Sequence, residues 1–211
     1  MRYVLLIVLA ACAGKVPETR YYQLAAPPTP KQEPAQVAVA VEPLTADAAY
    51  DDDRIVYRLT PYRLDYYNYQ RWSSPPGTML GNYLQDVLTK SGRFRAVMHE
   101  ATDAVPVTLG GRVIALEEID KSKTEWVGHV AVELTLTDTV TNKVLWAQQY
   151  DETEPLREQS PEGLAKAISI AMARITEKAL PAVTEIAEQR QKAHEEQIGL
   201  HERADQTEHR Q

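Results

Sequence analysis

Cys12 is the only cysteine of the chain, and its position gives the clearest indication of chemistry in the sequence. Residues 3–11 form an apolar run of about nine residues that follows Arg2 and ends in two alanines. A basic start, a short apolar core and small residues before a cleavage point are typical of a secretory signal. The run is too short for the ~20 residues of a transmembrane helix. We interpret residues 9–12 as a lipobox that is cleaved before Cys12, whose thiol then carries a diacylglycerol and is labelled by palmitate.

The predicted cleavage divides the N-terminal part of the chain into two segments. Residues 1–11 are the expected lipoprotein signal peptide, and residues 12–36 are the acylated N-terminus with a proline-rich tether. Each buried CH₂ of an acyl chain contributes ~0.8 kcal/mol, so a cysteine with several chains is a stable anchor. Residues 25–36 contain four prolines, and such a segment is an extended, semi-rigid spacer. We therefore expect a folded domain that is held near a membrane by Cys12.

The rest of the chain contains no complete catalytic or metal-binding motif. His194 and Glu195 begin like a zinc-protease HExxH motif, but Ile198 occupies the position of the second histidine. Asp51, Asp52 and Asp53 lack the spacing of an EF-hand and are expected to be solvated. The sequence contains no GxSxG nucleophile elbow and no phosphate-binding glycine loop. We expect no catalytic residues, no metal, no cofactor and no enzymatic activity.

The charge balance limits the partners. The chain has 30 acidic residues against 23 Lys and Arg, and this acidic balance argues against nucleic acid. The aromatic segment at residues 62–72 indicates a different type of partner. Tyr, Trp and Arg are enriched at binding hot spots, and this segment ends in a group of such residues. Its candidate partner-binding residues are Tyr67, Tyr69, Arg71 and Trp72. The alternative is that one face of this strand belongs to the core and the other covers a sheet edge.

The periodicity of apolar residues predicts a βββ-α-ββββ-α order for the domain. Residues 78–91 have apolar positions at helical spacing and end at Gly92, and a second helix is expected from Pro161. Apolar and other residues alternate over 126–138, and a turn at 141–143 predicts a long hairpin. The remaining predicted strands are 37–41, 54–59, 63–70, 93–98, 106–119 and 144–150. We predict an α+β fold of two layers, a mainly antiparallel sheet with two amphipathic helices packed on one face.

The two ends of the predicted domain are set by the composition. We place the domain at 37–183, because Pro181 is expected to end or kink the second helix. Residues 184–211 form a charged tail with few large apolar side chains. Such a segment does not bury a core of its own, and we expect it to be mobile or to depend on a partner. Gly110 and Gly111 lie within a strand pattern and predict a β-bulge.

The chain resembles the ABC-type transport auxiliary lipoprotein family of the paraquat-inducible, membrane-integrity type. The resemblance covers roughly residues 12–183 and depends on the order and spacing of its motifs rather than on one of them. In chain order these are the lipobox at Cys12, Tyr21-Tyr22-Gln23-Leu24, the valine strand at 37–41, Arg71-Trp72, the helix opened by Pro75-Pro76, Gly111 with Leu116-Glu117, the turn at 141–146 and the final helix rich in Ala and Ile.

The resemblance implies a role without catalysis. Members of this family accompany an ABC permease, its ATPase and a mammalian-cell-entry (MCE) domain protein in moving lipids or other hydrophobic molecules between membranes. By this analogy, Ala13 after the cysteine favours the periplasmic face of the outer membrane, where the domain docks an MCE protein and forms a homo-oligomer. Two alternatives stay open, namely a different assembly or chaperone lipoprotein of the outer membrane and a lipid-anchored envelope hydrolase.

Overall fold

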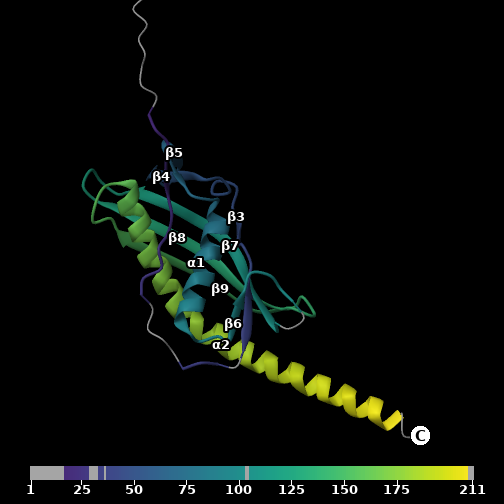
Figure 1. The fold of residues 1–211 in the computed structure, drawn as a ribbon. Coiled ribbons are helices and arrows are strands. Elements are labelled where there is room, and N and C mark those ends of the chain that lie inside the picture. The colour runs from purple at the N-terminus through teal and green to yellow at the C-terminus, as the bar shows by residue number, and fades with distance from the viewer. Residues whose placement is uncertain (1–16, 29–32, 36, 103–104, 209–211) are drawn as a thin grey trace, which may run out of the picture.

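A computed structural model describes residues 17–28, 33–35, 37–102 and 105–208, with the side chains of 197–208 left out of the description. The predicted lipobox and Cys12 lie outside these residues. Two helices lie over a large sheet (Figure 1). Neither helix in the described part of the chain has an apolar stretch long enough to cross a bilayer.

The described residues form nine strands and two helices, and the elements predicted from the sequence are all present. The helices are α1 (Pro76–Ser91) and α2 (Pro161–Glu208). Two short strands, β1 and β3, were not predicted. The strands are β1 (Arg20–Tyr22), β2 (Ala38–Val41), β3 (Thr45–Ala46), β4 (Arg54–Thr60), β5 (Arg63–Trp72), β6 (Ala96–Met98), β7 (Val107–Asp120), β8 (Trp126–Asp138) and β9 (Val144–Pro155).

The strands form one mixed sheet, so the expectation of an α+β fold is confirmed, whereas a mainly antiparallel sheet is not. Strand β7 pairs antiparallel with β8, which pairs antiparallel with β9. On its other side β7 pairs in parallel with β2, β3 and β4. Five of the eight strand pairings are parallel. Short turns join antiparallel neighbours, whereas the early strands reach β7 through long connections that include α1, and such crossovers produce parallel pairs.

Alternation along β8 supplies the centre of the core, as the sequence predicted. Val130, Val132, Leu134 and Leu136 are fully buried and belong to one cluster with residues of both helices. Gly128 continues this face and allows α2 to approach β8 closely. A Cβ at Gly128 would lie 3.1 Å from the side chain of Ile168. The helices are therefore held by apolar side chains that the strand pattern directs to one side.

The glycine pair in β7 does not form the predicted bulge but allows the neighbouring strand to approach closely. Gly110 and Gly111 pair regularly with β8, and the register shift occurs between Val113 and Ala115. Gly111 has a φ of 149°, a conformation that side chains disfavour. A Cβ there would lie 2.0 Å from the carbonyl oxygen of Glu133. Glycine is needed at this position for close approach of β8, and the bulge lies a few residues further on.

Helix α2 continues past the position at which it was expected to end. Pro181 lies inside the helix, and Val183, Thr184 and Ala187 are buried. The prediction that residues after 183 bury no core was therefore wrong for the first turns of this segment. The burial of these side chains offsets the loss of the helical hydrogen bond that Pro181 cannot donate. The guanidinium of Arg190 then pairs with Asp138, and the last turns extend away from the sheet (Figure 1).

Residues 20–28, expected to belong to a free tether, are part of the folded domain. Strand β1 pairs in parallel with β5, with Arg20 opposite Gln70. Leu24 and Ala26 pack against the main core. The sequence did not predict this strand, because three residues are too few to show a period. Residues 20–28 therefore do not act as a free spacer.

Candidate functional site

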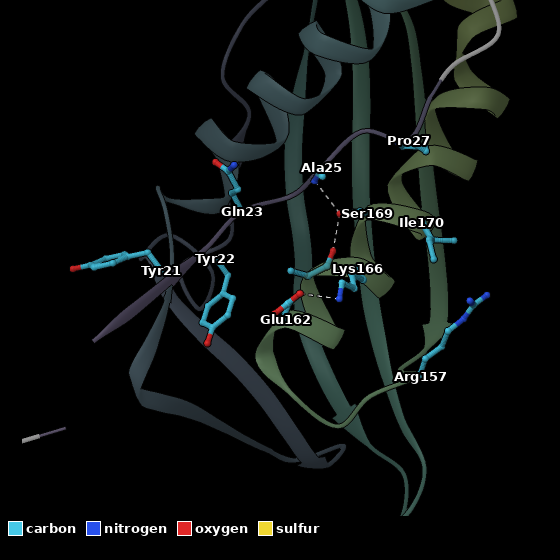
Figure 2. Close-up of a pocket in the computed structure, with 11 residues that line it drawn as sticks. Tyr21, Tyr22, Gln23, Ala25, Pro27, Arg157, Glu162, Lys166, Ser169 and Ile170 are labelled. Carbon is cyan, nitrogen blue, oxygen red and sulfur yellow. Dashed lines mark hydrogen bonds and ion pairs between the residues drawn. The ribbon is translucent and has the colours of Figure 1, made fainter. Parts of the chain in front are cut away.

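A groove of about 690 Å³ lies between the N-terminal segment and the first half of α2 (Figure 2). Tyr21 and Tyr22 line it from one side, and Ala165 and Ile170 of α2 line it from the other. Aromatic and small apolar groups of this type bind through van der Waals contact and burial. The groove therefore provides a surface for contact with apolar groups.

Hydrogen bonds fix the position of the N-terminal segment on α2. The backbone N–H of Ala25 donates to Ser169 Oγ at 3.1 Å, and that hydroxyl donates to the carbonyl of Ala165 at 2.6 Å. Glu162 and Lys166 form an ion pair of 2.8 Å on the same helix (Figure 2). At the start of the segment, Tyr22 Oη donates to Gln70 Oε1 at 2.9 Å. The segment after the predicted anchor is thus attached to both α2 and β5.

The structure separates the four candidate partner-binding residues of β5. Trp72 is 0% exposed and belongs to the core. Tyr67 is half-buried, and its hydroxyl donates to Glu118 Oε1 at 2.8 Å. Its ring lies 5.0 Å from the ring of Tyr57. Neither Trp72 nor Tyr67 presents its ring to a partner in this conformation.

Tyr69 and Arg71 remain accessible on the same strand. Tyr69 is 40% exposed. The Arg71 guanidinium pairs with Asp53 and lies 3.8 Å from Asp52. These two side chains form the part of the predicted patch that a partner can reach, and we call them the β5 pair.

A β-bulge in β5 explains why Trp72 turns to the same core as Tyr67. Arg54 lies opposite Arg71, but Val56 lies opposite Tyr66, so β5 contains extra residues between these pairs. Extra residues change which face each later side chain takes. Strict alternation would place Trp72 on the same face as Tyr66. The extra residues turn it to the main core instead.

A buried ionic network links four elements at a second hollow, of about 700 Å³. Glu117 of β7 is 2% exposed. Its carboxylate accepts from Arg58 Nε at 3.0 Å and from Tyr50 Oη at 2.8 Å. His129 Nδ1 lies 3.1 Å from Glu117, and Nε2 of the same ring lies 3.1 Å from Asp151. The network thus connects β4, β7, β8 and β9.

The network shifts the pKa values of Glu117 and His129 in opposite directions, each toward the charged form. Burial alone would raise the pKa of Glu117, but hydrogen bonds from His129, Arg58 and Tyr50 together lower it. The hydrogen bond to Glu117 raises the pKa of His129 above its usual value, against an opposing effect of burial. Both shifts favour a carboxylate and an imidazolium in contact. The arrangement fixes the relative position of the strands, because each charged side chain finds its hydrogen-bond partners on a neighbouring strand.

No group of three or more His, Cys, Asp and Glu side chains could hold a metal ion in the described part of the chain. The sequence did not reveal the network, because its members are distant in the chain. The one available signal was His129 on the polar side of the predicted hairpin, which lies directly opposite Glu117 once the register is known.

Comparison with known proteins identifies the family. The model of the ABC-type transport auxiliary lipoprotein component matches residues 22–179. The chain belongs to this family. It is therefore an auxiliary lipoprotein of ABC-type transport, and the matched range includes the whole ionic network and the β5 pair. No curated protein matches the chain significantly.

Solved structures show the same fold for this auxiliary lipoprotein. Protein XCC0632 from Xanthomonas campestris is 20% identical, with a TM-score of 0.67 over 82% of this chain and 99% of that chain. A second crystal structure, of an uncharacterized protein, is 13% identical, with a TM-score of 0.59 over 81% and 99% of the two chains. At these identities the similarity concerns the fold alone.

Proposed function

We propose that this auxiliary lipoprotein is the lipid-anchored periplasmic component of an ABC/MCE-type system that moves lipids or other hydrophobic molecules between membranes. Acylated Cys12 holds it at the periplasmic face of the outer membrane. The domain docks an MCE-domain protein, possesses no catalytic role, and assembles with further copies of itself.

One observation carries the mechanical part of this proposal. The segment that follows the anchor is incorporated into the sheet through β1 and is bonded to α2 through Ala25 and Ser169. A force on the anchor therefore reaches the core directly rather than through a long free linker. This arrangement supports a docking function, since the domain is held in a limited volume at the membrane.

The β5 pair is the proposed contact with the MCE-domain partner. Tyr69 and Arg71 are accessible and lie on β5, the strand with which the N-terminal β1 pairs. An exposed Tyr and Arg offer the amphipathic and charged contacts that dominate protein interfaces. The extended end of α2 supplies a second accessible element for further copies or for the partner.

Affinity capture from detergent-solubilised membranes tests this function. Tagged full-length protein should recover an MCE-domain protein, and the double change Tyr69→Ala with Arg71→Ala should reduce the recovery about tenfold, as expected for residues of a hot spot. Val144→Ala with Lys143→Ala is the matched control, because it removes an exposed apolar and an exposed basic side chain after the β8–β9 turn. Failure of the folded wild-type protein to recover any MCE-domain protein would contradict the proposal.

A further inference from the structure

The turn between β4 and β5 carries an unusual exposed group. Tyr62 is 98% exposed and Leu59 is 45% exposed. Pro61 lies between them and is also exposed. Large apolar side chains at a turn tip are unfavourable in water, and burial against another surface removes this cost. Tyrosine is typical of membrane–water interfaces.

The chain between Cys12 and β1 has as many residues as the strand between this turn and Gln70. Arg20 lies opposite Gln70 in a parallel pair, so both chain segments approach this pair from the same direction. Cys12 precedes Arg20 by eight residues, and Tyr62 precedes Gln70 by eight residues. Eight residues span at most about 29 Å when fully extended, and the same number of strand residues rises about 27 Å.

These two lengths restrict where the domain can stand. When the N-terminal end of β5 points toward the bilayer, a fully extended tether places the acyl groups at the level of Tyr62. Any less extended tether draws the turn into the membrane surface. The bulge in β5 shortens the strand, which leaves only a small clearance for the turn.

The end of β7 lies beside this turn. Leu59, Pro61, Ile119 and Lys121 line the same hollow. Two pairs of opposite charges lie near the turn, Arg63 with Asp65 at 2.7 Å and Lys121 with Glu125 at 3.5 Å. A surface of paired charges and exposed apolar groups favours the headgroup region of a bilayer over a highly charged partner.

We propose that the β4–β5 turn, with Tyr62 and Leu59, inserts into the surface of the membrane in which Cys12 is anchored. The contact orients the domain so that the N-terminal end of β5 and the start of α2 face the bilayer and the β8–β9 turn faces away. This inference rests on the proposed acylation of Cys12. The contact depends on apolar burial, so neutral lipids suffice and salt weakens it little.

Fluorescence quenching in vesicles tests this orientation. Cys12 is the only native thiol and is blocked by acylation, so Tyr62→Cys or Val140→Cys gives a single site for the dye NBD. Val140 is the matched control, because it is 57% exposed at the β8–β9 turn. The lipidated full-length variants are reconstituted into phosphatidylethanolamine–phosphatidylglycerol vesicles with brominated acyl chains.

We expect quenching at position 62 to exceed that at position 140 about fivefold, because bromine on the acyl chains reaches only groups at the interface. Adding Leu59→Asp should reduce quenching at position 62 at least about twofold. If the protein floats with the vesicles but both dyes stay unquenched, the inserted turn is overturned while the anchor stands. If the wild-type protein does not float with the vesicles, the anchor itself fails, and the inserted turn fails with it.

Discussion

At the scale of single residues, two adjacent carboxyl groups of β7 have opposite environments. Glu117 is held as a carboxylate by Arg58, Tyr50 and His129, which lower its pKa. Burial raises the pKa of Glu118 to about 7, although a hydrogen bond from Tyr67 opposes this effect. Alternation directs the two side chains to opposite faces of the sheet. The carboxylate form is therefore stabilised for Glu117 on one face and disfavoured for Glu118 on the other.

The raised pKa of Glu118 predicts a pH-dependent effect of Glu118→Gln. A folded-state pKa above the usual 4.5 contributes stability that is full below about pH 4.5 and is lost as the pH rises through about 7. Glutamine does not ionise, so the variant avoids this loss. Relative to wild type, its free energy of unfolding should rise by about 2 kcal/mol between about pH 5 and 8. Denaturant unfolding at a series of pH values measures this, with exposed Glu125→Gln as a control that should show no such trend.

His129 should stabilise the fold most at mildly acid pH. Its folded-state pKa is raised first by Glu117, so its contribution is full below the usual value of 6.5 and is lost as the pH rises through the higher folded value. His129→Gln should cost about 1.5–3 kcal/mol at about pH 6, the range for hydrogen bonds to charged groups, and less at higher pH. His99→Gln, at an exposed position, is the matched control. Equal costs at all pH values would contradict the role assigned to the imidazolium.

At the scale of elements, the bulge in β5 decides which aromatic residues are structural. Trp72→Ala removes a fully buried side chain and should lower the free energy of unfolding by about 3–5 kcal/mol. Tyr69→Ala removes an accessible side chain and should change it by less than about 1 kcal/mol. Denaturant titration of both variants at one pH provides the comparison. Similar costs for the two changes would mean that the two side chains are equally buried.

The elements themselves could largely be predicted from the sequence, and their exceptions have physical causes. The alternation of β8 and the αL glycine at Gly92 after α1 both set bounds that the structure confirms. The end of α2 could not be predicted, because the core that buries Ala187 is formed by distant strands. The short β1 has too few residues for a period, and its pairing with β5 depends on tertiary contact.

The candidate site was less predictable than the elements. A count of aromatic residues pointed to β5, but the extra residues opposite Arg54 and Val56 decide which of them face solvent. The ionic network depends on the pairing of Glu117 with His129 across two strands. Register of this kind is set by the whole sheet and cannot be read from either strand alone.

At the scale of the whole molecule, the docked N-terminal segment divides the predicted tether into two parts with different effects. Insertion of about 20 flexible residues between Cys12 and β1 should lengthen the reach of the domain by tens of ångströms. The same insertion between residues 28 and 33 should leave the reach unchanged, because β1 and Ala25 still attach to the domain. Energy transfer from a dye at position 140 to acceptor lipids measures this in reconstituted vesicles. An equal fall in transfer for both insertions would contradict a docked segment.

The claim that Cys12 is an acylated anchor at the outer membrane underlies the whole account, and one measurement tests it most directly. The intact mass of the protein is determined after extraction from separated inner and outer membranes. We predict a chain that begins at Cys12, carries a glycerol with its acyl chains, and is concentrated in the outer-membrane fraction. A chain with an unmodified thiol at Cys12, recovered with the soluble proteins, would contradict the account.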